Sequence, residues 1–409
     1  MALEVIERKE YMDRLWQLRD TQLIKVITGV RRCGKSTLLM LFMAKLKKNG
    51  VEDGQIQYIN FEDLDSYELR NPMKLYAHLK SHLQERKSNY IILDEIQHVE
   101  NFPEVVDSLY IRPGVDIYIT GSNAYMLSSE IATVLSGRYV ELAMLPLSFR
   151  EFTEAIHGEE NLPVSYKAYI ENSSFPYALA LRGRPDILED YLEGIFNTII
   201  VKDIMTRKKV SDPLVLESVV RFLFNSIGNL ISTKKITDTL RSNGRTVSSL
   251  TVETYLAALQ ESFVLYRASR YNVKGKEYLK TLEKYYLVDI GLRRVLLGRK
   301  AADVGHILEN VVYLELLRRH YKVYVGKWDD KEVDFVAMGR DGIVYIQVFA
   351  TVRDEKTLKR ELAPLVAIPD NYPKLLLTLD EDPEADYNGI RQKNALEWMM
   401  GYSNGFGGV

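Results

Sequence analysis

The first residues that could do chemistry follow a short apolar strand near the amino terminus. Residues 24–28 read Ile-Lys-Val-Ile-Thr, and residues 29–37 read Gly-Val-Arg-Arg-Cys-Gly-Lys-Ser-Thr before an apolar helix. Gly29 and Gly34 allow the backbone to approach a phosphate closely, so that successive N–H groups turn inward at the start of a helix. The spacing GxxxxGKS is therefore typical of a phosphate-binding P-loop.

Each side chain of this loop suggests a separate contact with a nucleotide. Lys35 offers a point charge to the β- and γ-phosphates, and Ser36 offers a hydroxyl to Mg²⁺, a hard ion that prefers oxygen ligands. Arg31 and Arg32 are further candidates for phosphate contacts, although both could equally be solvated. The sequence thus predicts a site for ATP and Mg²⁺, with the nucleotide contacted by Gly29, Arg31, Arg32, Cys33, Gly34, Lys35, Ser36 and Thr37.

A pair of acidic residues lies at the end of another apolar run. Residues 90–93 read Tyr-Ile-Ile-Leu and are followed by Asp94 and Glu95. In a parallel sheet this strand end would face the P-loop, where Asp94 could hold Mg²⁺ through water and Glu95 could polarise the attacking water. An Asp-Glu pair alone is often only a helix N-cap. The P-loop upstream favours the catalytic interpretation, in which the segment resembles a Walker B motif.

The elements that position these groups follow from the order of apolar segments. A third strand over residues 116–120 ends in Gly-Ser-Asn, where the amide of Asn123 could orient water near the γ-phosphate, although such residues are also ordinary turn formers. Short apolar strands separated by helical segments, such as residues 73–86, predict right-handed βαβ units. We therefore expect an α/β domain with a doubly wound parallel sheet.

Taken in order, five segments resemble a known family: GVRRCGKSTLL, LDEIQ, TGSNA, LSGRY and LPLSFREF. They look like the prokaryotic AAA+ predicted ATPases that combine an AAA_14-type P-loop domain with a DUF4143 C-terminal region. The resemblance implies an ATPase core over residues 1–155, and the helical pattern of apolar residues that follows predicts a lid over 156–210. The resemblance also implies that Arg138 is an arginine finger or sensor arginine, acting in cis or in trans. A surface arginine is the alternative.

The middle of the chain predicts a winged-helix domain over residues 211–297. Three amphipathic helices, expected over 214–227, 235–241 and 249–260, precede a strand and a hairpin-like segment. Duplex DNA is a candidate partner because the expected wing carries several lysines that could contact phosphates: Lys274, Lys276, Lys280 and Lys284. Lysines are usually just solvated, and winged helices also bind proteins, so an unidentified protein partner is the alternative.

Residues 298–409 resemble a nuclease fold of the PD-(D/E)XK type. An expected helix over residues 304–320 carries Glu309, and a following strand carries Asp334. In that fold such carboxylates hold Mg²⁺, and a lysine on the next strand aids the attacking water.

The third element of this nuclease pattern departs from it. Gln347 replaces the second strand carboxylate, and Phe349 stands where the lysine belongs. A neutral amide binds Mg²⁺ weakly, and a phenyl ring cannot position water. Lys331 is the only substitute amine that the sequence places nearby. We expect the fold to persist, with a closing helix over residues 390–400, and cleavage to be absent or badly weakened.

Composition limits the remaining choices. The chain has 409 residues, of which 46% are hydrophobic, which is enough for two or three domains. A formal net charge of -2 gives no global basic field for nucleic acid. The single cysteine, Cys33, excludes an internal disulfide framework, and no apolar run approaches the roughly 20 residues that span a bilayer. A cytoplasmic protein without a membrane partner is expected, and a homo-oligomer remains open.

Two main functional hypotheses follow from these motifs. The first is an ATPase switch that couples hydrolysis to rearrangement of the C-terminal domains on a partner. The second is an interaction or regulatory protein that binds nucleotide and turns it over slowly. Glu95 favours the first, because an acid beside Asp94 is needed for hydrolysis and not for storage of nucleotide. A metal-dependent nuclease is a weaker third alternative.

Overall fold

The computed structural model describes residues 5–124, 134–205, 212–298 and 304–401 of the chain. The chain forms two compact units. Unit 1 comprises Met1–Pro146 with Glu261–Phe263, and unit 2 comprises Leu147–Gln260 with Val264–Val409.

Unit 1 contains a five-stranded sheet in the order β2-β3-β4-β1-β5, and every neighbouring pair is parallel. The strands are β1 (Ile24–Thr28), β2 (Ile56–Asn60), β3 (Asn89–Asp94), β4 (Val115–Gly121) and β5 (Tyr139–Ala143). All residues of β1 and β3 are buried, which fits central strands covered on both faces. The predicted α/β class with a parallel sheet is confirmed.

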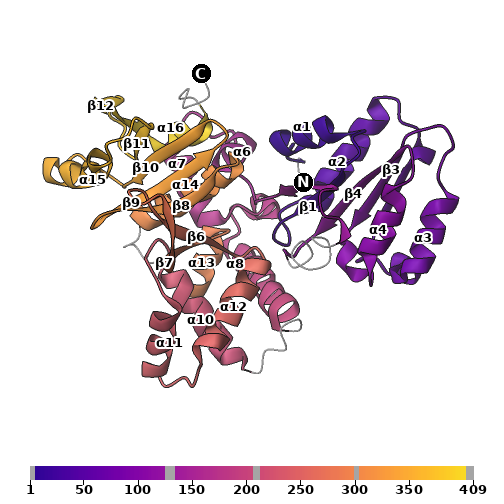
Figure 1. Cartoon of the computed structure of the whole chain (residues 1–409), viewed down its shortest axis with the longest axis horizontal. Coiled ribbons are helices and arrows are strands. Elements are labelled where there is room, and N and C mark those ends of the chain that lie inside the picture. The colour runs from indigo at the N-terminus through magenta and orange to yellow at the C-terminus, as the bar shows by residue number, and fades with distance from the viewer. Residues whose placement is uncertain (1–4, 125–133, 206–211, 299–303, 402–409) are drawn as a thin grey trace. The chain divides into compact units, whose positions relative to one another are not determined.

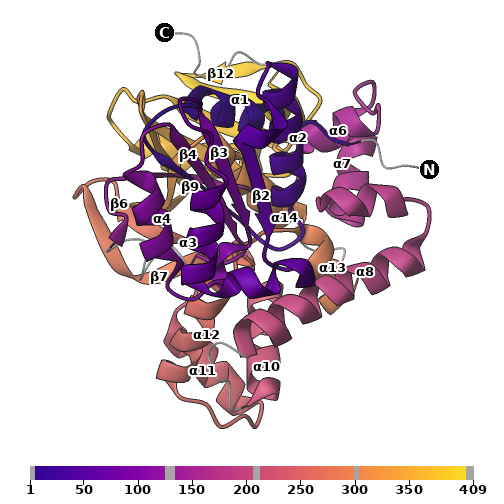
Figure 2. The ribbon, with the colours of Figure 1, turned by 90° about the vertical axis from the view of Figure 1, so that its right-hand side faces the viewer.

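Helices cover both faces of this sheet (Figures 1 and 2). The helices of unit 1 are α1 (Lys9–Leu18), α2 (Lys35–Lys48), α3 (Pro72–Ser81) and α4 (Phe102–Tyr110), with 3-10 turns over Asp53–Gln55, Leu64–Arg70 and Ile96–His98. On one face, the rings of Trp16 on α1, Phe42 on α2 and Tyr118 on β4 pack in succession. On the other face, α3 and α4 bury their apolar side chains against alternate residues of β1, β3 and β4.

Unit 2 contains most of the helices. They are α6 (Phe149–Ala155), α7 (Leu162–Asn172), α8 (Pro185–Asn197), α10 (Pro213–Asn225), α11 (Thr233–Ser242), α12 (Ser249–Glu261), α13 (Ile290–Leu297), α14 (Val304–Arg318), α15 (Glu355–Ala367) and α16 (Ala395–Met400), with a 3-10 turn over Pro176–Leu181 and a π-helical segment over Thr198–Met205. Helices α10, α11 and α12, gathered together in Figure 1, match the three amphipathic helices predicted there within two residues. Within the described residues, no helix is long and apolar enough to cross a membrane.

An eight-stranded mixed sheet organises the rest of unit 2, in the order β12-β13-β11-β10-β9-β8-β6-β7. Its strands are β6 (Leu265–Asn272), β7 (Glu277–Leu287), β8 (Lys322–Trp328), β9 (Lys331–Gly339), β10 (Gly342–Val348), β11 (Lys374–Thr378), β12 (Ala385–Tyr387) and β13 (Ile390–Asn394). The β6–β7 hairpin, predicted as the wing, pairs through β6 with β8. The segments predicted as winged-helix and nuclease-like domains therefore share one sheet, and both domain assignments stay predictions.

One predicted element near the carboxyl terminus is wrong. A closing helix was expected over residues 390–400, but residues 390–394 form β13, and only Ala395–Met400 is helical. Asn388 and Gly389 both have positive φ, 56° and 88°, which is the turn geometry that joins two antiparallel strands tightly. This Asn-Gly turn pairs β13 with β12, and β13 also pairs in parallel with β11.

A buried cap in unit 2 gives a test of the fold. Asp289 is 2% exposed, and its carboxylate accepts hydrogen bonds from the Leu292 N–H at the start of α13 and from the N–H and hydroxyl of Ser174. We expect Asp289→Ala to lower the free energy of unfolding by about 2–4 kcal/mol, because several buried donors lose their acceptor. The exposed N-cap variant Asp212→Ala, on α10, should cost only about 1 kcal/mol. Urea denaturation measures both, and equal losses would contradict this account.

Candidate functional site

The loop between β1 and α2 has the backbone geometry that its glycines predicted. Gly29 and Gly34 have φ angles of 148° and 104°, and α2 begins directly at Lys35. A Cβ on Gly29 would lie 2.1 Å from the Met144 carbonyl oxygen, so no larger residue fits there without a backbone shift. The first N–H groups of α2 have no partner within the helix and form a ready site for an anion.

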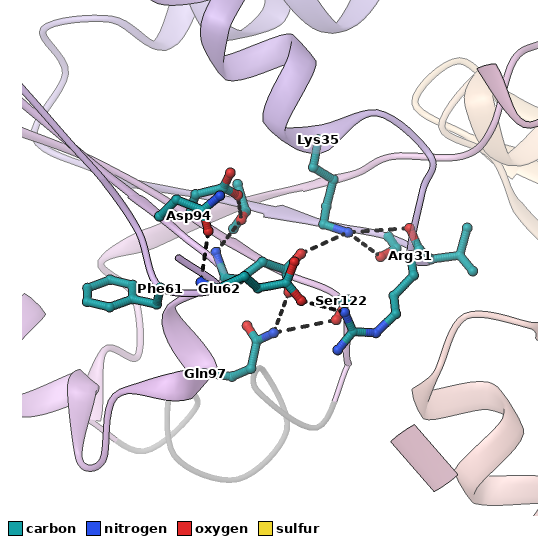
Figure 3. Close-up of polar contacts among 12 residues, drawn as sticks. Arg31, Lys35, Phe61, Glu62, Asp94, Gln97 and Ser122 are labelled. Carbon is teal, nitrogen blue, oxygen red and sulfur yellow. Dashed lines mark hydrogen bonds and ion pairs between the residues drawn. The ribbon is translucent and has the colours of Figure 1, made fainter. Parts of the chain in front are cut away.

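Lys35 lies at the centre of the site and is buried. Its ammonium donates hydrogen bonds to the carbonyls of Gly29, at 3.0 Å, and Val30, at 3.3 Å. Its Nζ also lies 3.5 Å from Oε1 of Glu95, which forms an ion pair across the site (Figure 3). The P-loop lysine and the strand-end glutamate that the sequence predicted to act together are therefore in contact.

Glu95 follows β3 in a left-handed conformation, with φ 55° and ψ 48°. Its N–H donates to the Thr120 hydroxyl at 2.8 Å, and its carboxylate accepts hydrogen bonds from Gln97 and Ser122. Burial alone would raise the pKa of Glu95, but the Lys35 ammonium and these hydrogen bonds outweigh burial and lower it. Glu95 is thus held as a carboxylate at neutral pH.

Asp94 is fully buried at the last position of β3. Its carboxylate accepts hydrogen bonds from the Tyr58 hydroxyl, at 3.0 Å, and from the Thr120 hydroxyl. Burial raises the pKa of Tyr58 and the Asp94 carboxylate raises it further, so this phenol remains a donor. An anionic oxygen ligand here, together with the Ser36 hydroxyl in the first turn of α2, suits the donor set that Mg²⁺ prefers.

The other residues of the loop that were predicted to contact nucleotide differ from one another in burial and in partners. Arg31 pairs with Glu62 at 2.8 Å, and its guanidinium turns toward the carboxylates in Figure 3. Arg32 is exposed and has a φ of 66°. Cys33 is buried, and burial raises the pKa of its thiol. Ser36 and Thr37 lie half-buried in the first turn of α2.

Asn123 was predicted to orient water near the γ-phosphate, but at this turn the structure brings a different side chain to the carboxylates. Asn123 is buried after the end of β4, but the preceding residue, Ser122, contacts Glu95. The amide of Gln97 lies 3.4 Å from the Ser122 hydroxyl and joins the same group (Figure 3). The role predicted for Asn123 stays a prediction, while Ser122 is placed directly on the glutamate.

Arg138 is not brought to the P-loop of its own chain. Its carbonyl accepts the N–H of Ile24, at the start of β1, and its guanidinium pairs with Asp107 on α4. The P-loop lies at the other end of β1, roughly 13 Å along the strand at about 3.3 Å per residue. The cis role is therefore not supported by this arrangement, and action on a neighbouring subunit stays a prediction.

Four side chains that contact the candidate site were not predicted from the sequence. Thr120 and Tyr58 reach Asp94 from the strands on either side of β3, which requires the strand order to be known. Gln97 was visible two positions after Glu95, as the last residue of LDEIQ. Arg8 had no local signal at all. Its buried guanidinium donates to the carbonyls of Cys33 in the P-loop and Leu145 after β5.

A second group of titratable side chains lies in unit 2, around Lys284 on β7. Its ammonium contacts Glu309 on α14 at 2.8 Å, and Glu332 and Asp334 on β9 at 2.9 and 3.2 Å. Burial, only partly offset by Lys284, raises the pKa of Glu309 to about 7. The predicted pair Glu309 and Asp334 is therefore brought together, but around a lysine.

Two expectations about lysines in this region are wrong. Lys331 is exposed, and its ammonium donates to the Ala363 carbonyl, so it does not serve as the substitute amine. Lys284 was predicted on an exposed wing, yet its side chain is only 4% exposed. The alternation of β7 turns this lysine inward, into the sheet side that α14 covers.

Family comparisons agree with the geometry of unit 1. Residues 21–153 match the family model AAA_14, described as an AAA domain. Residues 164–303 match DUF8612, a domain of unknown function, in place of the expected DUF4143 region.

Two relatives define the family of the whole chain. An uncharacterized protein of Haemophilus influenzae is 39% identical over 404 residues, covering 98% of this chain and 100% of the relative. An uncharacterized protein of Methanocaldococcus jannaschii is 30% identical over 335 residues, covering 78% of this chain and 73% of the relative. The chain belongs to the family of these proteins, and its amino-terminal part is an AAA domain.

Among solved structures, the Walker-type ATPase of Pyrococcus abyssi is similar, with a TM-score of 0.47 and 17% identity. The match covers 71% of this chain and 96% of that structure.

The close approach at Gly29 gives a test of the site. We expect Gly29→Ala to lower ATP affinity more than about tenfold, because the new Cβ forces the loop away from the Met144 carbonyl. Gly50→Ala is the matched control, since Gly50 also has a positive φ of 89° but a Cβ added there would meet nothing within 4 Å. Calorimetric titration with ATP compares the two. Similar affinities would show that the loop tolerates the overlap.

Proposed function

We propose that the chain is a Mg²⁺-dependent ATPase whose nucleotide state acts on its carboxyl-terminal region. The observation that carries the ATPase proposal is the contact between Lys35 and Glu95 beside the anion-binding start of α2. A lysine for phosphate and a carboxylate for water lie at one end of a parallel sheet, with Asp94 at the last position of β3, directly before Glu95.

Binding of ATP begins with an exchange of partners at Lys35. The ammonium leaves Glu95 and the carbonyls of Gly29 and Val30 for phosphate oxygens, which are stronger acceptors for a cation. The N–H groups of the loop and of the first turn of α2 surround the same phosphates. Asp94 and Ser36 would hold Mg²⁺, which when bound neutralises charge on the β- and γ-phosphates.

Hydrolysis then uses the carboxylate that Lys35 has released. Glu95 accepts a proton from the water whose oxygen attacks the γ-phosphorus, while the bond from that phosphorus to the β-phosphate oxygen breaks and ADP leaves. Gln97 and Ser122 keep Glu95 oriented during this step, because their hydrogen bonds do not depend on Lys35. Their donors also favour the ionised form that the step requires.

A path from the P-loop to the end of unit 1 supports the switch. Arg8 donates to the carbonyl of Cys33 and to those of Leu145 and Pro146, the residues at which unit 1 ends. Movement of the loop on nucleotide binding would therefore displace the segment that leads into unit 2. The partner on which the switch acts, DNA or protein, stays a prediction from the sequence.

Two substitutions separate binding from hydrolysis. Glu95→Gln should lower kcat by about 10²–10⁴-fold and leave ATP binding intact, because the amide accepts no proton. Lys35→Ala should lose ATP binding, whereas Lys45→Ala, a control on the same helix, should lose nothing. Steady-state phosphate release and calorimetry measure the two quantities. Equal turnover in all four proteins, wild type included, would overturn the ATPase proposal.

The positioning role of Gln97 predicts a change in kcat alone. Gln97→Leu removes the amide that contacts Glu95, and a displaced carboxylate should lower kcat roughly 10- to 100-fold with KM unchanged. Gln57→Leu is the control, because its amide donates to the Leu79 carbonyl, away from the nucleotide site. A parallel rise in KM for Gln97→Leu would indicate that this residue serves binding or folding instead.

A further inference from the structure

The group around Lys284 has a simple arrangement of charges. The Nζ of Lys284 has three N–H donors, and three carboxylates lie within 3.2 Å of it, one from α14 and two from β9. These residues line a pocket of about 560 Å³, and Gln347 and Glu361 also line it. The ammonium is thus the central cation of a shell of oxygens.

Some of the carboxylate oxygens around Lys284 also accept hydrogen bonds from other donors of the protein. Oε1 of Glu309 also accepts the Tyr286 hydroxyl at 2.6 Å, and Oδ2 of Asp334 accepts the Val348 N–H at 3.0 Å. Glu361 accepts the amide of Gln347 at 3.0 Å. A metal ion would have to displace several of these bonds.

The distances are those of an ammonium and not of a magnesium ion. Nitrogen-to-oxygen distances of 2.8–3.2 Å match charge-assisted hydrogen bonds, whereas Mg²⁺ requires six oxygens at about 2.1 Å. Among the residues that the structure describes, no group of three or more His, Cys, Asp or Glu is arranged to hold a metal ion. The residues therefore do not fit the Mg²⁺ that a PD-(D/E)XK nuclease would require.

We propose that Lys284 is a built-in cation that takes the place of a divalent metal ion among Glu309, Glu332 and Asp334. Two strands and a helix are joined by this ammonium, so the carboxylates are neutralised without any ion from solution. The lysine comes from β7, outside the positions in which the nuclease pattern places its own lysine. Unit 2 thereby holds three carboxylates together without a metal ion.

The proposal predicts that removing Lys284 creates a metal site. We would measure Mn²⁺ binding by electron paramagnetic resonance without nucleotide, with Asp94→Asn in every protein so that the P-loop site does not contribute. The protein that retains Lys284 should bind no Mn²⁺ at this cluster. Lys284→Ala should gain one bound ion, because three carboxylates then face a vacated space, and adding Asp334→Asn should abolish that gain.

Two further variants control for charge and for folding. Lys274→Ala removes an exposed lysine in the β6–β7 turn that pairs with Asp329 in the β8–β9 turn, and should gain no Mn²⁺. Lys284→Arg keeps a cation in place and should also bind none. The proposal is overturned if the protein with Lys284 binds Mn²⁺ in a manner that Asp334→Asn removes. It is equally overturned if folded Lys284→Ala gains no ion. The comparison with and without Asp334→Asn can be made in the protein that retains Lys284. It can therefore overturn the proposal even if Lys284→Ala does not fold.

Discussion

A buried ammonium must always have oxygen partners, and this constraint shapes both units of the chain. Removing a charge from water costs several kcal/mol unless close, well-oriented partners replace the lost hydration. Lys35 in unit 1 and Lys284 in unit 2 are each only about 4% exposed, and each lies beside carboxylates from a neighbouring element. The positions of β3, α14 and β9 relative to these lysines are therefore under strong electrostatic restraint.

The two lysines differ in how readily they can change partners. Lys35 contacts two neutral carbonyls of its own loop and one carboxylate, which lies no closer than 3.5 Å. Lys284 contacts three carboxylates, all within 3.2 Å. A triphosphate offers Lys35 more negative charge than it gives up, whereas Lys284 already has three carboxylate partners. The first arrangement suits a binding site, and the second suits a permanent link.

The parts of the site that lie within one stretch of sequence were predictable. The strand, the glycine loop and the start of α2 are contiguous, and Asp94 and Glu95 directly follow an apolar run. Parallel strands bring their carboxyl ends to one edge, so these two stretches had to meet. Thr120 and Tyr58 could not be assigned in this way, because their contact with Asp94 depends on which strands flank β3.

The predictions for Lys284 and for residues 390–394 in unit 2 are wrong because each local sequence pattern fits two structures. Lys284 stands among Tyr285, Tyr286 and Leu287, a run that indicates burial, yet it was grouped with exposed lysines of an expected wing. Two of its carboxylate partners, Glu309 and Asp334, are 25 and 50 residues away, so no short motif could contain them. Similarly, the turn at Asn388 was a local signal for a hairpin, but the apolar residues beyond it also fit a helix.

The backbone attachment of the β6–β7 hairpin explains why the ion pairs between Lys284 and the carboxylates on α14 and β9 would be retained. Strand β6 pairs with β8 over only three residues, from Arg270 to Asn272, and β7 is an outer strand of the sheet. The segment between α10 and α11 in turn pairs with β7 through Ile231 and Glu283, the residue next to Lys284. The ammonium thus adds side-chain bonds to α14 and β9 at the point where the three-helix segment joins the sheet. A metal ion from solution could make the same connection only when bound, whereas a lysine makes it at all times.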